Sequence, residues 1–212
     1  MALNKLQALK LIQFLNQSIK NPETSLKYRN QFTLLASVVL SAQCTDTNVN
    51  NVTKNIYKKY YTAKHFADLG IKKIKKMIKS IGLFNMKAKN LFNLSKILFE
   101  KYQSKVPNNF EDLIKLPGVG RKTANVVLNA AFNKPTIGVD THVFRVSNRT
   151  GLTRGKNPDQ VEKKLLEILP TKYLKKAHHL ILLHGRYICK SRNPLCSKCI
   201  INKICLYKYK NV

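Results

Sequence analysis

A short run of proline and glycine most constrains how this chain folds. Residues 116–120 read Leu-Pro-Gly-Val-Gly. Such a run turns tightly, because proline fixes φ and glycine reaches conformations that other residues avoid. Apolar residues at helical spacing precede the run at 110–114 and follow it at 124–131. The sequence therefore predicts two helices joined by a hairpin, over residues 110–131.

The hairpin has the properties of a phosphate-binding site. Gly118, Val119 and Gly120 can present successive backbone N–H groups to an anion. The second helix starts here, so its N-terminal amides and dipole also favour a phosphate, and Arg121 and Lys122 follow on the phosphate side. An ordinary turn between two helices remains the alternative. A nucleotide-binding loop fits less well, because the run lacks a Gly-Lys-Ser/Thr ending and a preceding strand.

Helical periodicity extends over almost the whole chain. Apolar residues recur about every 3.6 positions, and no segment alternates convincingly as a strand does. The valines between residues 32 and 42 leave a strand as a minor alternative there. The predicted fold class is all-α. The expected helices lie at 2–20, 32–42, 46–60 after a cap at 45 or 46, 71–81, 88–98, from 141, from 158 and at 172–188, with an exposed turn at 82–85.

The chain is strongly basic. Its 39 Lys and Arg residues outnumber its 10 Asp and Glu residues, for a formal net charge of +29. Such an excess indicates a polyanionic partner that binds more weakly as salt rises, although part of it can simply cover solvated helix faces. No apolar run is long enough to cross a bilayer. A basic N-terminal helix lying on an acidic membrane would leave the hairpin and the cysteines unexplained, so we expect a cytoplasmic protein without a membrane partner.

Four of the five cysteines crowd near the C-terminus, with six, two and five residues between them. Disulfides are unexpected without a secretory signal, so four thiolates indicate a tetrahedral zinc ion or an iron–sulfur cube. Zinc sites usually contain two Cys-x-x-Cys pairs, whereas only one occurs here, which favours iron–sulfur. Cys44, the fifth, is interpreted as a small packing residue. The clustered cysteines are Cys189, Cys196, Cys199 and Cys205.

Several motifs together match one family. They are Leu40–Gln43, Ile81–Leu83, the hairpin with Lys122, Val139–His142, His184–Tyr187 and the cysteine spacing. On these motifs, which cover nearly the whole length, the chain resembles endonuclease III, a family of DNA glycosylases in the helix-hairpin-helix superfamily. The resemblance implies a two-lobed fold, in which residues 24–134 form a six-helix barrel. Residues 1–23 and 135–212 would form the second lobe, with a 4Fe-4S cluster in the loop 189–205.

The same resemblance implies a bifunctional base-excision-repair enzyme that acts as a monomer on double-stranded DNA. It would remove oxidised pyrimidines and then cut the strand at the abasic site, by β-elimination through a lysine Schiff base. Lys122 would be the nucleophile and Asp140 its catalytic partner. Gln43 and Leu83 would fill the gap left by the extruded nucleotide. The hairpin would bind the DNA backbone, and the four clustered cysteines would ligate iron.

Physical chemistry accounts for these roles. A base cannot react inside the stack, so it is extruded at a cost of a few kcal/mol, which a damaged base lowers. A lysine amine is protonated at neutral pH, so Lys122 must lose a proton before it attacks. The helix N-terminus, Arg121 and exclusion of water favour this loss, whereas a nearby Asp140 carboxylate opposes it. Asp140 can accept the proton or stabilise a cationic sugar. The structural alternative is that Asp140 only caps its helix. His142 and His184 are interpreted as structural residues.

Two other interpretations account for part of the pattern. Relatives that remove adenine or mismatched thymine lack the lysine, and the adenine-specific ones carry an extra domain for which 212 residues leave no room. A DNA-binding module without catalysis, built around structural zinc, would explain the charge, the hairpin and the cysteines. It would not explain the combination of residues assigned to base extrusion and to catalysis. The enzyme is therefore the preferred interpretation.

Overall fold

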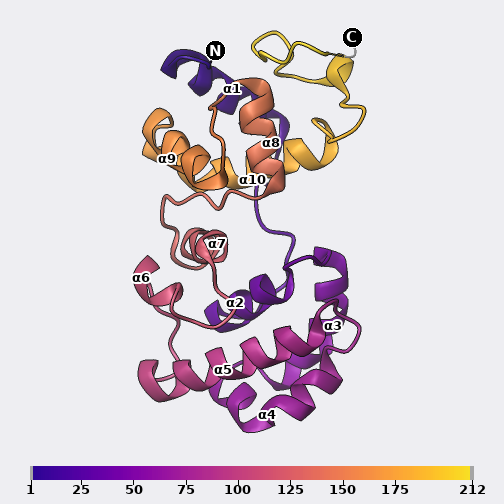
Figure 1. Cartoon of the computed structure of the whole chain (residues 1–212), viewed down its shortest axis with the longest axis vertical. Helices are drawn as coiled ribbons and strands as arrows, with labels where there is room; N and C mark the ends of the chain where they lie inside the picture. Colours follow the sequence, from indigo (N-terminus) through magenta and orange to yellow (C-terminus); the bar gives the residue numbers. More distant parts are fainter. Residues whose placement is uncertain (1, 211–212) are drawn as a thin grey trace. The chain divides into compact units, whose positions relative to one another are not determined.

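The computed structural model describes residues 2–210. All regular structure in this part of the chain is helical, without a strand (Figure 1), so the all-α prediction is confirmed. None of the described helices is long and apolar enough to cross a membrane. The elements are α1 (Lys5–Ser18), α2 (Gln31–Leu40), α3 (Asp46–Lys59), α4 (Ala63–Met77), α5 (Phe84–Tyr102), α6 (Phe110–Leu113), α7 (Arg121–Phe132), α8 (Thr141–Thr150), α9 (Pro158–Ile168), α10 (Thr171–Tyr187) and the 3-10 turn η1 (Cys196–Lys198).

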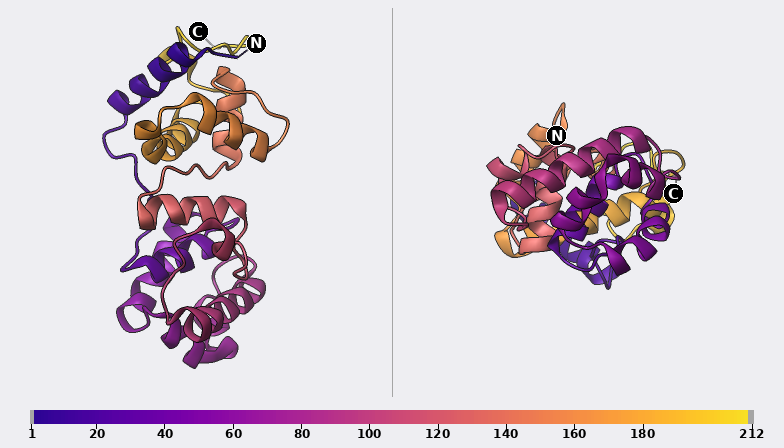
Figure 2. Two further views of the ribbon diagram at one scale, coloured as in Figure 1. Left: turned by 90° about the vertical axis from the view of Figure 1, so that its left-hand side faces the viewer. Right: turned by 90° about the horizontal axis from the view of Figure 1, so that it is seen from below.

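The chain folds into two compact units. We call Ser25–Phe132 the central unit, and Met1–Thr24 together with Asn133–Val212 the terminal unit. The central unit contains the six helices α2 to α7. Both ends of the chain contribute to the terminal unit, where α1 packs against α10 (Figure 1, Figure 2). The hairpin and the cysteine loop thus belong to different units.

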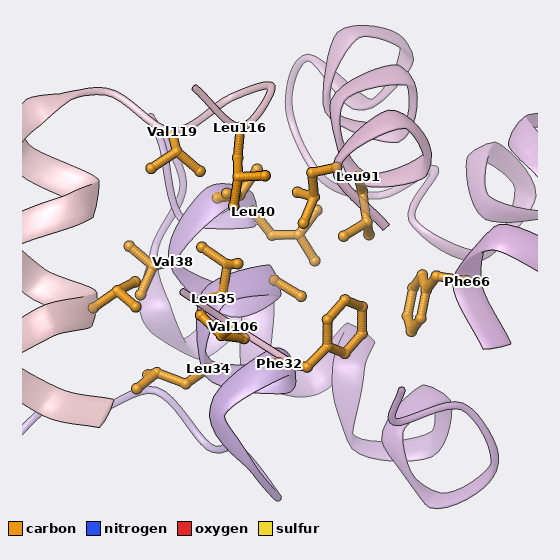
Figure 3. Close-up of a cluster of buried hydrophobic side chains, with 14 of the residues drawn as sticks. Phe32, Leu34, Leu35, Val38, Leu40, Phe66, Leu91, Val106, Leu116 and Val119 are labelled. Carbon is orange, nitrogen blue, oxygen red and sulfur yellow. The ribbon is translucent and has the colours of Figure 1, made fainter. Parts of the chain in front are cut away.

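Helix α2 is the centre of the core of the central unit. It is apolar on all sides, and every residue from Phe32 to Leu40 is buried. A helix forms here because Asn30 caps the first turn, accepting a hydrogen bond from the Thr33 N–H at 2.9 Å, and because other helices surround it. The Ser37 and Tyr57 hydroxyls satisfy each other inside this core at 2.9 Å. Side chains from other elements complete it, among them Phe66, Leu91, Leu116 and Val119 (Figure 3).

One helix ends earlier than the sequence predicts. The isoleucine spacing predicts a helix up to Gly82, whereas α4 ends at Met77 and is interrupted at Gly70, where φ is 70°. Ile78 and Ile81 remain buried, each 1% exposed, because the chain turns inward and the Ile81 N–H donates to the Ile78 carbonyl at 2.9 Å. The apolar period therefore continues past the helix, and the expected helix over 71–81 is wrong at its end.

The terminal unit has a separate core between α1, α8, α9 and α10. Two of its helices begin where the sequence predicts, since Asp140 caps α8 and Asn157 caps α9 with Pro158 at the first position. Gly151 ends α8 with φ at 78°, and a Cβ there would lie 2.7 Å from the Leu206 side chain. The C-terminal segment therefore packs directly on the end of α8. Fully buried residues of this core include Leu11, Ile12, Leu15, Val146, Leu165, Leu180 and Ile181.

Candidate functional site

The hairpin joins α6 to α7 and is tightly fixed to the rest of the central unit. Gly118 has φ at 80°, and a Cβ there would lie 3.0 Å from the Asn90 side chain and 3.2 Å from Val39 Cγ1. Glycine alone combines this conformation with this close approach. Leu116 and Val119 are buried and point into the core (Figure 3). The backbone of the turn is thereby held against α2 and α5.

The backbone N–H groups of the hairpin differ in whether they are hydrogen-bonded within the protein. The Val119 N–H donates to the Leu116 carbonyl at 3.0 Å, so this amide closes the turn. The described part of the chain offers the Gly118 and Gly120 amides no acceptor. Gly120 directly precedes α7, and its carbonyl accepts the Ala124 N–H at 2.9 Å. The expected row of three outward amides is therefore reduced to two, at a helix N-terminus where an anion is favoured.

Lys122 is exposed and is the second residue of α7, which begins at Arg121. Within this fully described helix, the first turn contains no acidic residue. The Arg121 guanidinium lies 5.2 Å from the centre of the Phe110 ring, so it links the start of α7 to α6. Two cations and a helix N-terminus thus share one turn beside the hairpin.

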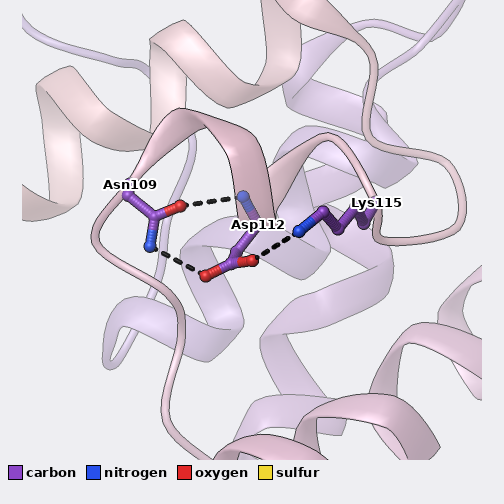
Figure 4. A network of polar contacts seen from close by, with 3 residues as sticks. All are labelled: Asn109, Asp112 and Lys115. Carbon is purple, nitrogen blue, oxygen red and sulfur yellow. Dashed lines mark hydrogen bonds and ion pairs between the residues drawn. The ribbon is translucent and has the colours of Figure 1, made fainter.

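A polar network fixes the approach to the hairpin (Figure 4). Asn109 Oδ1 accepts the Asp112 N–H at 2.8 Å and caps α6, while its Nδ2 donates to Asp112 Oδ2 at 2.9 Å. Lys115 Nζ donates to Asp112 Oδ1 at 3.0 Å. The hydrogen bonds from Asn109 and Lys115 lower the pKa of Asp112 below its usual value. This carboxylate is therefore ionised at neutral pH and is held by its own neighbours.

Two exposed turns carry the residues predicted to fill the gap left by an extruded nucleotide. Gln43 follows α2 with φ at 53°, and Leu83 precedes α5 with φ at 58°; Leu83 is 51% exposed. Such left-handed conformations cost about 1–3 kcal/mol for residues other than glycine. A Cβ at Gly82 would lie 3.9 Å from the Gln43 carbonyl oxygen. The structure therefore brings the two turns side by side.

Asp140 lies in the terminal unit, as the N-cap of α8. Its Oδ1 accepts the Val143 N–H at 2.8 Å, so the capping interpretation is confirmed. The side chain is half-buried, and its Oδ2 has no hydrogen-bond partner among residues 2–210. Lys122 belongs to the central unit. The two residues predicted as catalytic partners therefore come from different units.

The four clustered cysteines line one pocket of the terminal unit. All are free thiols. Burial raises the pKa of Cys199 to about 11 and also raises the pKa of Cys205, so these thiols keep their protons unless a cation compensates. Within the described residues, no three His, Cys, Asp or Glu side chains gather closely enough to hold a single metal ion. Four soft sulfur donors around one pocket fit an iron–sulfur cluster.

Two N–H groups and one imidazole nitrogen lie near the cysteine sulfurs, and such second partners orient ligands and tune the group they hold. Burial lowers the pKa of His184 to about 4, so its ring is neutral and carries one N–H. His184 also lines the cysteine pocket, a position that agrees with the structural role expected of it. The contacts are Arg149 Nη1 to Cys189 Sγ at 3.8 Å, the Tyr207 N–H to Cys205 Sγ at 3.5 Å, and His184 Nε2 to Cys199 Sγ at 3.7 Å.

Two arginines that motif reasoning misses hold the start of the cysteine loop. Arg145 Nη2 donates to the Gly185 carbonyl at 2.8 Å and to the Cys189 carbonyl at 3.2 Å. Arg149 Nη1 donates to the Lys190 carbonyl at 2.6 Å. Both arginines therefore satisfy carbonyls near the C-terminal end of α10. Their spacing of four, which places them on one face of α8, is the only signal of this role in the sequence.

Known proteins share this fold and sequence. Residues 36–171 match the HhH-GPD superfamily of base excision DNA repair proteins. Endonuclease III of Rickettsia conorii is 55% identical over 94% of this chain and 95% of its own, and that of Escherichia coli K12 is 47% identical over 98% and 99%. An endonuclease III trapped as a covalent intermediate with DNA has a TM-score of 0.91 at 42% identity, covering 96% of each chain. A thermostable thymine-DNA glycosylase has a TM-score of 0.82 at 26% identity, covering 96% of this chain and 95% of its own.

These similarities extend over both units. The family match begins in α2 and ends at the first residue of α10, so it includes the hairpin and Asp140. The similarity inferred from the sequence motifs is confirmed. The chain belongs to the HhH-GPD superfamily of base excision DNA repair proteins, within which it is a member of the endonuclease III family of DNA glycosylases with abasic-site lyase activity.

Proposed function

We propose that this protein removes damaged pyrimidines from double-stranded DNA and then cleaves the strand at the abasic site. The observation that carries the proposal is Lys122, exposed at the start of α7 directly after the glycine hairpin. A phosphate bound by the hairpin would hold the DNA backbone beside this amine. An amine nucleophile also accounts for a covalent intermediate with DNA, the form in which an endonuclease III has been trapped.

The two exposed turns serve base extrusion. A stacked base is inaccessible, so the nucleotide leaves the helix at a cost of a few kcal/mol. Leu83 is an apolar side chain exposed on a strained turn, which suits insertion between base pairs. The Gln43 amide can hydrogen-bond the base left without its partner. Together they stabilise the open duplex.

Lys122 and Asp140 perform the chemistry. The Lys122 amine attacks C1′ of the sugar while the bond from C1′ to the base breaks and the base departs with its electron pair. The amine loses its proton before it attacks, because only the neutral form has a free electron pair. Asp140 Oδ2 accepts a proton or stabilises positive charge on the sugar. The attached nitrogen loses a proton, and its lone pair then breaks the bond from C1′ to O4′, which takes up a proton, so that a protonated imine forms at C1′. The imine acidifies the C2′ hydrogen, and loss of that proton breaks the bond from C3′ to oxygen and expels the 3′ phosphate.

The DNA backbone is bound by charge and by amides. The Gly118 and Gly120 amides and the Arg121 guanidinium bind phosphate, which carries no sequence information. The net charge of +29 adds affinity that falls as salt rises. Selection therefore depends on which base is extruded, and oxidised or ring-saturated pyrimidines, which stack poorly, are the expected class. We expect a monomer to carry out both steps.

The cysteine pocket holds a 4Fe-4S cluster in this proposal. Cys189, Cys196, Cys199 and Cys205 are its ligands, and the bound group cross-links the loop without entering the reaction. Structural zinc is the alternative, since four thiolates also suit that ion. Protein purified without oxygen is expected to be yellow-brown and to contain iron. A colourless protein with one zinc per chain would favour the alternative.

Borohydride trapping on a duplex with one abasic site tests the lysine chemistry. Borohydride reduces the imine to a stable amine, so the protein stays attached to the DNA. We expect an adduct with the wild-type protein and none with Lys122→Ala. Lys115→Ala is the matched control, because it removes another exposed lysine next to the hairpin, and it should keep the adduct. No adduct from active wild-type protein would leave a glycosylase without lyase activity or a DNA-binding protein.

A further inference from the structure

The turns that carry Gln43 and Leu83 come from different elements. Gln43 lies between α2 and α3, and Leu83 lies between α4 and α5. Both residues have left-handed backbone conformations, and no side chain caps α5 at Leu83. Conformations of this kind persist only when the surrounding structure holds them. Each turn has backbone hydrogen bonds of its own, and a contact between the two turns adds to what keeps both residues in place.

Asn48 makes this contact. Its Nδ2 lies 3.3 Å from Cys44 Sγ and 3.3 Å from the Ser80 carbonyl oxygen. Cys44 is adjacent to Gln43 in the chain, and Ser80 precedes Leu83 by three residues. An amide nitrogen carries two hydrogens, so one side chain can donate to both turns at once.

The orientation of Asn48 is itself fixed by α3. Its backbone N–H donates to Thr45 Oγ1 at 3.2 Å in the first turn of the helix, and the next residue, Val49, is fully buried. With its oxygen and nitrogen exchanged, the amide would place an acceptor against the Ser80 carbonyl, which is also an acceptor. The half-buried side chain therefore has one satisfied orientation.

We propose that Asn48 is a positioning residue that joins the Gln43 and Leu83 turns into one rigid wedge for opening the duplex. The inference rests on the proposed function, because it assumes that both residues enter the base stack. Asn48 acts through the turns and contacts no reacting atom. It therefore affects base extrusion and leaves the lysine chemistry intact, so its effect depends on whether the DNA has a stack to open.

The test compares Asn48→Asp with Asn55→Ala under single-turnover conditions. Asn48→Asp keeps the size of the side chain and suits the first turn of a helix, but it has no N–H to donate. Asn55→Ala truncates an exposed asparagine of the same helix. We expect Asn48→Asp to slow base release from a duplex with one dihydrothymine by about tenfold, the effect of losing two hydrogen bonds. Adduct formation on a single-stranded oligonucleotide with one abasic site should stay within about twofold, and Asn55→Ala should match wild type on both.

Fluorescence of 2-aminopurine placed opposite an abasic site in a duplex reports the opening directly. The wild-type protein should raise this fluorescence on binding, and Asn48→Asp should raise it less at saturating protein. Equal slowing on both substrates, or an unchanged fluorescence rise, would overturn the inference. Cys44→Ala removes one of the two acceptors and should give a smaller loss of the same kind, which keeps the test valid if Asn48→Asp does not fold. If wild-type protein neither releases the base nor forms an adduct, the proposed function fails instead.

Discussion

The hairpin of the central unit and the cysteine loop of the terminal unit differ in what holds their conformation. The hairpin buries Leu116 and Val119 in an apolar core and is closed by its own hydrogen bonds. The cysteine loop instead surrounds a pocket lined by thiols, where burial raises the pKa of Cys199. The hairpin is therefore preformed by the protein alone, whereas we expect the order of the loop to depend on the group that its thiols are proposed to hold.

The largest expected effect is that of Cys199→Ala. Removing one thiol from the pocket should destabilise the terminal unit by an amount on the order of 5 kcal/mol, because binding energy of the held group is folding energy. The central unit should keep its fold. Hydrogen exchange measured separately in α10 and α2 checks this, and exchange should rise only in α10.

Cys44→Ala is the matched control for this prediction. Cys44 is also a free thiol, but it lies in the central unit outside the pocket. It should leave both the colour of the protein and the protection of α10 unchanged. Equal protection of α10 in Cys199→Ala and wild type would mean that the loop is as preformed as the hairpin.

Asp140→Asn should give the next largest effect, and it separates structure from chemistry in the terminal unit. Asparagine caps helices as well as aspartate does, so the hydrogen bond to the Val143 N–H is kept and the melting temperature should not change. Base release should slow about 100-fold, as expected when a group that handles a proton or stabilises charge is lost. Single-turnover excision and thermal unfolding are the measurements. An unchanged rate of base release would instead leave Asp140 with a capping role alone.

The two glycines of the hairpin provide a third, smaller test. Gly118→Ala should destabilise the central unit by about 1–3 kcal/mol, because φ is 80° and the new Cβ would meet Asn90 and Val39. Gly120→Ala should change stability by less than about 0.5 kcal/mol, since a Cβ there meets nothing within 4 Å. Urea denaturation of both variants checks this. Equal stability of the two would show that the turn is not held as the structure indicates.

Local signals in the sequence predicted much of the fold. Helical periodicity and capping residues located most helices, including the caps at Asp140 and Asn157. The exposed position of Leu83 was also predictable, because a glycine precedes it after an apolar stripe. These features depend on residues within one or two turns of each other, which is the range over which a sequence pattern is informative.

Contacts between distant segments were not predictable. Helix α4 ends early, at Met77, because the chain then turns and packs into the core. The spacing of apolar residues in the sequence is the same for a helix and for such a buried turn, so it does not distinguish them. Arg145 and Arg149 bond to carbonyls about 40 residues away in sequence, a relation that no motif encodes. The link from Asn48 to Ser80 is of the same kind, because it needs two turns brought together by the fold.

The smallest expected effect is that of Asp112→Asn, which probes how firmly the approach to the hairpin is fixed. The pKa of Asp112 is lowered in the folded protein by Asn109 and then Lys115, so its stabilising contribution is present above the ordinary carboxyl pKa of about 3.9. That contribution is lost as pH falls through the lower folded value. The network is solvent-exposed, so the variant should melt only about 1–2 °C below wild type at pH 7 and low salt. The difference should shrink as pH falls below the ordinary carboxyl pKa, and it should also shrink in high salt. A difference that persisted at low pH would mean that the carboxylate charge does not matter here, and that α6 is held by the Asn109 cap and the apolar contacts of the hairpin.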